Sequence, residues 1–341
     1  MKVKRKWKKA ALLFLAALIA TPFICDLTEN VSEKVIRGAY ETLIGEPGKR
    51  FLVDESGIPI VDYKYQGELY IGEQRNPVTI SLKALEYYER YEAGDEEGEQ
   101  LFLNCSDWLI DNAVLYDSYA VLEYEFYWSY GNMTPPWRSG MAQGLALQVL
   151  IRAHSITNDE KYLNSAQRLL NCFFVGLENG GVTRKSAASG WWYEEYADEG
   201  SEETRVLNGM MFAVIGIHDY YQYTGDADAK YLFDQGIKAL EKGLPMYDNN
   251  GNSYYDILGN PSGKYHDIHI ELLDQLYRIT DRDIFKEYHH RWKDYKESFF
   301  VLRLIARPTR MGCAIFVGNF FVLLLLVGVI YILSERRKIK N

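Results

Sequence analysis

Cysteine is scarce in this chain, and its four cysteines have none of the short spacings of a metal site. Cys25 and Cys313 fall in apolar runs near the two ends, which leaves Cys105 and Cys172 in the body. A disulfide between these two would suit an oxidising compartment, and two buried free thiols fit equally well. We expect no metal centre and assign no other cofactor.

Acidic residues strongly outnumber basic ones in the body of the chain. The net charge is −9, but the two ends hold thirteen basic residues against one acid, Glu335, which leaves the body at −21. A body that acidic argues against nucleic acid as a partner, because phosphate backbones need a basic surface. It would also repel a long polyanion, so a local basic groove or a short, lipid-linked or less charged substrate is expected.

Two uncharged runs predict membrane segments. Residues 10–25 follow a basic tail, 1–9, and at about 24 Å they fit a signal anchor or a signal peptide. Residues 311–333 are long enough for a transmembrane helix and precede a second basic tail, 334–341. The basic tails predict that both termini are cytoplasmic and that the body is extracytoplasmic or lumenal.

A loose repeat of about 60 residues organises the body. Each copy has an apolar segment with helical spacing, a short turn that ends in aspartate, and a second apolar helical segment. The turn supplies a helix stop followed by an acidic cap for the next helix. The four turns are Tyr91–Asp95, Ile156–Asp159, Tyr223–Asp226 and Ile279–Asp283.

Four helical hairpins in a row, none able to bury its apolar face alone, predict a mainly α fold. We expect an α/α toroid, an incomplete α/α barrel, over residues 81–300. Residues 26–80 form a short lead-in, which includes a small β element from residue 53. Function is expected in the long connections between hairpins.

Tyrosine is abundant, with 27 residues, and three stretches place it beside acid or imidazole. A neutral phenol can donate a proton next to a carboxylate with almost no lasting charge, which suits proton transfer on an acidic sugar. The three stretches are Trp192–Tyr196, Tyr254–Asp256 and Tyr265–His269.

With these stretches, an ordered set of motifs resembles the C-terminal helical domain of D-glucuronyl C5-epimerases over roughly residues 65 to 297. Those enzymes convert glucuronate to iduronate in heparan-type chains. One departure is Leu258, which stands where the family pattern has an arginine, so the preferred sugar is expected to differ. The other motifs are Trp137–Gly144, Asn164–Ala166, Val206–Gly209 and Leu244–Asp248.

The resemblance implies that Tyr196, Tyr255 and Tyr265 are catalytic, with Glu195 as the adjacent carboxylate. Our hypothesis puts Tyr196 and Tyr255 on opposite faces of the sugar, and Tyr265 and His266 at its carboxylate. A tyrosinate at neutral pH would need nearby cations, which Arg138, Arg184, Lys185, His266 or Lys264 would supply; Glu195, if its pKa is raised, would be the alternative base. The expected substrate-binding residues are Trp137, Arg138, Gln143, Trp192, Tyr193, Asn208, Tyr247, His266 and His269.

The expected partners are a uronic-acid-containing glycan, the membrane and, in a homodimer, a second copy of the chain. A polysaccharide lyase would also remove the C5 proton, and only its unsaturated product would distinguish it. An inverting glycoside hydrolase would need two acids such as Glu195 and Asp256, and leaves the tyrosines unexplained. A membrane-tethered glycan-binding protein without turnover is the alternative from another class.

Overall fold

The computed structural model describes residues 2–44 and 50–340. Met1, residues 45–49 and Asn341 lie outside the described residues, and with them the outermost residue of each expected tail and a short part of the expected lead-in. The chain divides into a terminal unit, Met1–Gly48 with Asp294–Asn341, and a central unit, Lys49–Lys293.

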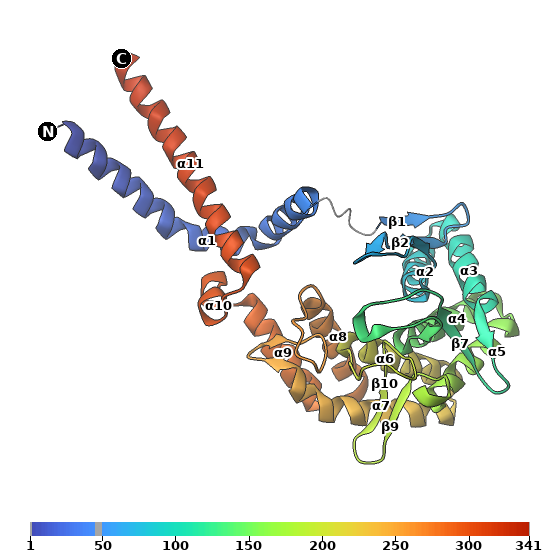
Figure 1. Ribbon diagram of the computed structural model, residues 1–341. Helices are drawn as coiled ribbons and strands as arrows, with labels where there is room; N and C mark the ends of the chain where they lie inside the picture. The colour runs from blue at the N-terminus through green and yellow to red at the C-terminus, as the bar shows by residue number, and fades with distance from the viewer. Residues whose placement is uncertain (1, 45–49, 341) are drawn as a thin grey trace. The chain divides into compact units, whose positions relative to one another are not determined.

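The central unit is built from four successive helical hairpins, as predicted (Figure 1). Helices α2, α4, α6 and α8 form an inner row in which each helix packs against the next. The partner helices α3, α5, α7 and α9 lie outside that row. The bounds are α2 Pro77–Glu92, α3 Glu96–Asp111, α4 Gly140–Thr157, α5 Glu160–Asn171, α6 Leu207–Thr224, α7 Ala227–Gly243, α8 Tyr265–Thr280 and α9 Asp283–Glu297. The predicted incomplete α/α toroid is thereby confirmed.

Three of the four predicted turns have the expected aspartate cap, whereas Asp283 of the fourth is the first residue of α9. The side chains of Asp95, Asp159 and Asp226 accept hydrogen bonds from backbone N–H groups in the first turns of α3, α5 and α7. Asn158 and Gly225 end α4 and α6 in the left-handed conformation, which glycine and asparagine adopt most easily. The repeated turn therefore stops one helix and caps the next.

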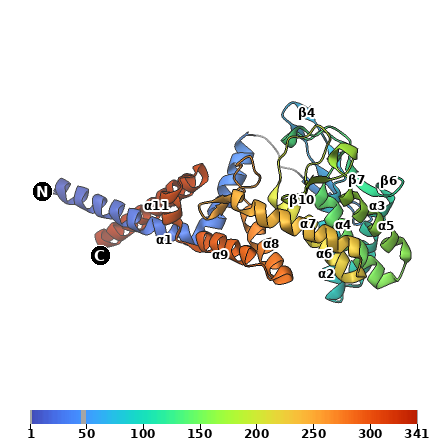
Figure 2. The same ribbon diagram turned by 90° about the horizontal axis from the view of Figure 1, so that it is seen from below.

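The connections between hairpins are longer and carry small antiparallel sheets, some of whose strands are labelled in Figure 1 and Figure 2. β1, β2 and β5 form a sheet ahead of α2, with the β3–β4 hairpin between them. β6, β7 and β8 precede α4, β9 and β10 precede α6, and β11 and β12 precede α8. The strands are β1 Arg50–Val53, β2 Pro59–Asp62, β3 Tyr65–Gln66, β4 Leu69–Tyr70, β5 Glu73–Gln74, β6 Ala113–Leu115, β7 Ala120–Tyr124, β8 Trp137–Arg138, β9 Thr183–Ser186, β10 Gly190–Tyr193, β11 Asp248–Asn249 and β12 Asn252–Ser253. Single 3₁₀ turns are η1 Tyr130–Asn132, η2 Cys172–Phe174, η3 Leu177–Asn179 and η4 Leu244–Tyr247.

The core is densest where α4 and α6 meet, because glycines let the two backbones approach closely. A Cβ added to Gly216 would lie 2.5 Å from the carbonyl carbon of Gly144, and one added to Gly144 would lie 2.5 Å from Ala213 Cα. Cys105 and Cys172 are buried free thiols in this core. Of the two alternatives for these cysteines, the structure therefore has the free thiols.

The terminal unit contains α1 Lys2–Ile44, α10 Phe300–Ala306 and α11 Arg310–Lys340. α1 packs against α10 and α11, and the guanidinium of Arg303 holds the carboxylate of Glu29 through two hydrogen bonds of 3.0 and 2.5 Å. Lys8–Ala39 and Arg310–Ser334 are long and apolar enough to cross a membrane by length and composition. The first of these helical segments continues well past the predicted apolar run 10–25.

The α4–α6 contact predicts a stability difference between two glycine substitutions. Gly216→Ala should lower the free energy of unfolding by about 1–3 kcal/mol, since a methyl group has no room against the α4 backbone. Gly243→Ala is the matched control, because its added Cβ would have no neighbour closer than 3.4 Å. Denaturant unfolding of both variants checks this, and equal stability of the two would contradict the packing argument.

Candidate active site

The long connections meet at the N-terminal ends of the inner helices, where backbone hydrogen bonds join them. The N–H of Gly140 at the start of α4 donates to the Glu194 carbonyl at 2.6 Å, and the N–H of Leu207 donates to the Tyr255 carbonyl at 3.0 Å. Arg138 and Ala197 exchange backbone hydrogen bonds of 2.9 Å. Three loops that are distant in sequence are thus fixed to one another.

Glu195, Tyr196 and Tyr255 form a chain of hydrogen-bonding oxygens at this junction. The Tyr255 hydroxyl donates to Glu195 Oε1 at 3.4 Å, and it lies 3.4 Å from the Tyr196 hydroxyl. Asn208, in the first turn of α6, donates from Nδ2 to Glu195 Oε2 at 3.3 Å. All three members of the chain are half-buried, so the chain is partly open to solvent.

Two further tyrosine rings complete the cluster. The ring of Tyr265, the first residue of α8, lies 4.9 Å from the Tyr255 ring between centroids. The ring of Tyr130 packs edge-on against Tyr196 at 4.9 Å and against Tyr255 at 5.8 Å. We call Tyr130, Tyr196, Tyr255 and Tyr265 with Glu195 the tyrosine cluster.

The protein around the cluster favours neutral forms of its acids. Burial raises the pKa of Glu195 to about 7, against the lowering effect of its hydrogen bonds from Tyr196, Tyr255 and Asn208. Burial, followed by the charge of Glu195, raises the pKa of Tyr196 and Tyr255 above the ordinary tyrosine value. The pKa of Tyr265 is raised for the same reasons. The surroundings therefore disfavour the ionised form of the tyrosines and bring the pKa of the Glu195 carboxyl group close to neutral pH.

Tyr130 was not among the site residues expected from the sequence, and its partner Asp256 was named there only for the hydrolase alternative. The Tyr130 hydroxyl donates to Asp256 Oδ2, and Asp256, fully buried, also accepts the N–H groups of Leu258 and Asn260 at 3.0 Å. Asp256 therefore organises its own loop. The sequence signal for Tyr130 was its position beside the turn residues Gly131 and Asn132. Nothing near it in the sequence indicates a partner 126 positions away.

The structure places most of the expected substrate-binding residues in the walls of the site or in the core. Gln143 is buried and bonds to the backbone of Leu122. The hydroxyl of Tyr193 donates to the Leu232 carbonyl and that of Tyr247 to the Arg205 carbonyl, both at 2.6 Å. Trp192 is also buried and stacks on Tyr247.

Trp137 and Asn208 lie against the cluster. The Trp137 ring is 5.8 Å from the Tyr196 ring, while its Nε1 donates to the Phe126 carbonyl at 2.7 Å. Asn208 is the residue described above as a donor to Glu195. Trp137 contacts the cluster from β8 and Asn208 from the first turn of α6.

His266 and His269 have a shared structural partner. The Nδ1 atoms of both rings lie within 2.9 Å of the Ser253 hydroxyl, and both side chains are buried. Burial and the neighbouring His266 lower the pKa of His269 to about 3. No group of three or more His, Cys, Asp or Glu side chains suited to a metal occurs among the described residues.

The cations expected near a tyrosinate are mostly engaged elsewhere. Arg138 bonds to Glu123 at 2.6 Å and Arg184 to Glu194 at 2.7 Å, while Lys185 lies over the Trp191 ring. Lys264 is the one of the five candidates that lies against a tyrosine of the cluster, with its Nζ 5.2 Å from the Tyr265 ring centroid.

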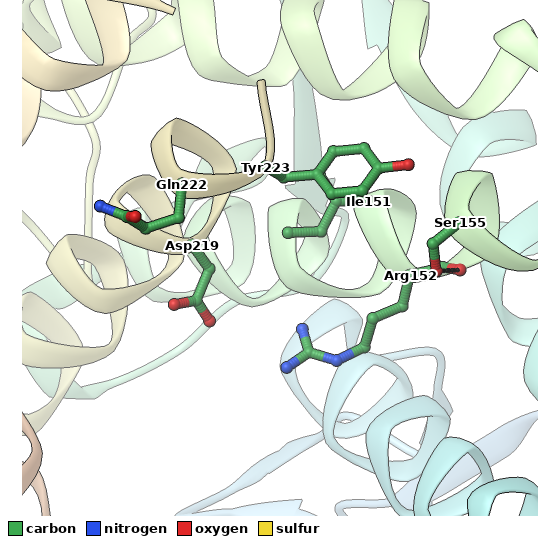
Figure 3. Close-up of a pocket in the computed structure, with 6 residues that line it drawn as sticks. All are labelled: Ile151, Arg152, Ser155, Asp219, Gln222 and Tyr223. Carbon is green, nitrogen blue, oxygen red and sulfur yellow. Dashed lines mark hydrogen bonds between the residues drawn. The ribbon is translucent and has the colours of Figure 1, made fainter. Parts of the chain in front are cut away.

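A separate groove of about 420 Å³ lies at the other end of α4 and α6. Figure 3 shows Arg152 and Ile151 of α4 facing Asp219 and Tyr223 of α6. Asp219 follows Asn208 by eleven positions, about 16 Å along α6. The groove is therefore remote from the tyrosine cluster, which remains the candidate active site because acids and phenols converge there.

Comparison with known proteins identifies the family of this chain. A family model described as the D-glucuronyl C5-epimerase C-terminus matches residues 111–294, which are more than half of the chain. An uncharacterized protein of Methanocaldococcus jannaschii is 30% identical over 314 residues, 86% of this chain and 100% of that protein.

The D-glucuronyl C5-epimerase of Caenorhabditis elegans is 31% identical over 221 residues, which are 59% of this chain and 35% of that enzyme. The chain thus spans about a third of the worm enzyme. Among solved structures, a GH76 α-mannanase of Bacteroides thetaiotaomicron has 15% identity and a TM-score of 0.49, over 83% of this chain and 72% of that chain. On the family match, this chain belongs to the D-glucuronyl C5-epimerase C-terminal domain family.

Proposed function

We propose that the chain is a carbohydrate epimerase that inverts C5 of D-glucuronate to L-iduronate within a glycan. Family membership supports a carbohydrate epimerase. The observation that carries the finer proposal is Glu195, a carboxyl group with a pKa of about 7 that accepts a hydrogen bond from a phenol. Such a group can take up and release a proton at neutral pH.

The reaction removes the proton on the carbon next to a carboxylate and returns a proton to the opposite face. Glu195 is the base in this proposal, acting through the Tyr255 hydroxyl that donates to it. The neutral Tyr196 phenol is the donor on the other face. Because Glu195, Tyr255 and Tyr196 are connected by hydrogen bonds, a proton taken up on one side can return to the other after turnover.

The sugar has to replace the hydrogen bond between Tyr196 and Tyr255. Their hydroxyls are 3.4 Å apart, whereas a carbon atom with a proton donor and a proton acceptor on its two faces needs them about 6 Å apart. Insertion of the ring between the two phenols would supply that separation. The half-buried position of both tyrosines supports access from solvent.

Lys264 is the proposed partner of the substrate's carboxylate. Removing the C5 proton adds negative charge to an anionic group, so a cation nearby lowers the barrier. The charge of Arg184 is already matched by Glu194 and that of Arg138 by Glu123. Lys264 is exposed and lies at the edge of the cluster over Tyr265, as this role requires.

The first prediction concerns the reaction class. Incubating the full-length protein with a glucuronate-containing oligosaccharide in deuterium oxide should place deuterium at C5 and produce iduronate, both detected by NMR. Chain shortening or an unsaturated uronate absorbing in the ultraviolet would indicate a lyase instead. Binding without exchange would indicate the non-catalytic alternative.

The second prediction concerns the proton-transfer groups. Glu195→Gln and Tyr255→Phe should each lower the C5 exchange rate by roughly 10²- to 10⁴-fold, the usual contribution of a general acid or base. Tyr223→Phe is the matched control, because it removes a phenol hydroxyl from the remote groove. If both cluster variants exchange at the wild-type rate, Glu195 and Tyr255 are not the base.

The third prediction is a pH dependence. Glu195 must be ionised to accept a proton, and its pKa is raised to about 7. The value of kcat/KM should therefore rise with pH and level off above about 7, with a tenfold loss per unit well below that. Rate measurements between pH 5 and 9 test this, and a limb centred near 4.5, the ordinary glutamate value, would argue against Glu195.

We further propose that α1 and α11 both cross a membrane, with the central unit extracytoplasmic or lumenal. The apolar segments Lys8–Ala39 and Arg310–Ser334 support this, since they have the length and composition of membrane helices. Labels fused to the N- and C-termini should be reached by a membrane-impermeant reagent from the cytoplasmic side alone. Labelling of the two ends from opposite sides would exclude two crossings.

A further inference from the structure

Glu195 lies over the first turn of α6 because residue 209 has no side chain. A Cβ added to Gly209 would lie 2.5 Å from Glu195 Cβ and 2.9 Å from its Cγ. No side chain caps this end of α6, so the carboxyl group occupies a position where the helix dipole favours negative charge. The side chain of Glu195 therefore needs a glycine at position 209 to keep its place.

Asn208 contributes a group that can serve either protonation state of a carboxyl. Its Nδ2 donates to Glu195 Oε2 at 3.3 Å, whereas its Oδ1, equally buried, has no hydrogen-bond partner in the described structure. An amide carries a donor and an acceptor side by side. When Glu195 is ionised it accepts from Nδ2, and when it is protonated its O–H can donate to Oδ1.

The carboxylate of Glu194, the preceding residue, has different hydrogen-bond partners from that of Glu195. Glu194 accepts hydrogen bonds from the Arg184 guanidinium at 2.7 Å and from the N–H of Arg205 at 3.2 Å. These contacts favour its charged form, although burial raises its pKa to about 7 against them. Glu195 accepts hydrogen bonds from the phenols of Tyr196 and Tyr255 and from the amide of Asn208, none of which is charged. Of the two adjacent glutamates, Glu194 thus has a cationic partner and Glu195 has neutral partners.

We propose that Asn208 and Gly209 form a seat that positions Glu195 for proton transfer and holds its carboxyl group in both protonation states. Asn208 thereby becomes a positioning residue instead of the substrate-binding residue expected from the sequence. The inference rests on the proposed role of Glu195 as the base. The titratable groups that face Glu195 are Glu194, Tyr124, Tyr130, Tyr196, Tyr255 and Tyr265.

The sharpest test is Asn208→Asp, which keeps the shape of the side chain and adds a like charge beside Glu195. A second carboxylate raises the pKa of the first, so the rising limb of kcat/KM should move to higher pH by about one unit or more. A substitution that merely loosened the fold would lower the rate without moving that limb. An unshifted limb would overturn the proposal.

Gly209→Ala tests the space requirement. Displacement of Glu195 should lower kcat by roughly 10- to 100-fold, with KM changed much less, because a small misplacement of a catalytic group costs about that much. Gly243→Ala is the control for glycine replacement within a helix, and circular dichroism confirms that both variants are folded. A folded Gly209→Ala variant with wild-type kcat would contradict the seat.

A direct titration separates this inference from the proposed function. In protein labelled with ¹³C at glutamate side-chain carboxyls, the Glu195 signal is identified by its loss in Glu195→Gln. It should titrate near neutral pH in the wild type and at higher pH in Asn208→Asp. If the wild type exchanges no C5 hydrogen, the proposed function fails, but this shift still decides whether Asn208 controls Glu195.

Discussion

The close contact between α4 and α6 is the constraint on which the site depends. Without side chains at Gly144 and Gly216, the two inner helices meet backbone to backbone. Their first turns are then near enough for the loop that carries Glu194 and Glu195 to bond to both, through Gly140 at the start of α4 and Asn208 at the start of α6. Bulkier contacts would separate the two anchors, and the carboxyl group would lose its fixed position.

Much of the fold could be predicted from the sequence because its determinants are local. Each hairpin turn combines a helix stop with an aspartate cap, and Asp159 and Asp226 perform that role in the structure. Helical periodicity of the flanking apolar residues then fixes which faces are buried. The loops of the site lack such periodicity, so their contacts depend on the tertiary structure.

The tyrosine cluster was predictable in part, because some of its members lie in sequence stretches that are unusual in themselves. Tyr196, Tyr255 and Tyr265 lie in unusual aromatic stretches, and the structure brings them together. Aromatic residues in the same loops, such as Tyr193 and Tyr247, instead have hydroxyls that satisfy buried backbone carbonyls. Sequence alone does not distinguish these uses, because a phenol suits a wet site and a backbone carbonyl equally well.

Charge pairing explains why neutral phenols surround Glu195. The arginines nearest the site are neutralised by carboxylates, Arg138 by Glu123 and Arg184 by Glu194. With those charges matched, no cation bonds to Glu195 in the described structure, and burial becomes the largest influence on its pKa. Burial also raises the pKa of Glu194 to about 7, although the charge and hydrogen bond of Arg184 oppose the rise. The two adjacent glutamates therefore differ in their partners and not in the direction of their pKa shift. The acidic body is therefore compatible with proton transfer at this site, since the few cations nearby are used to fix the loops and not to hold Glu195 in its charged form.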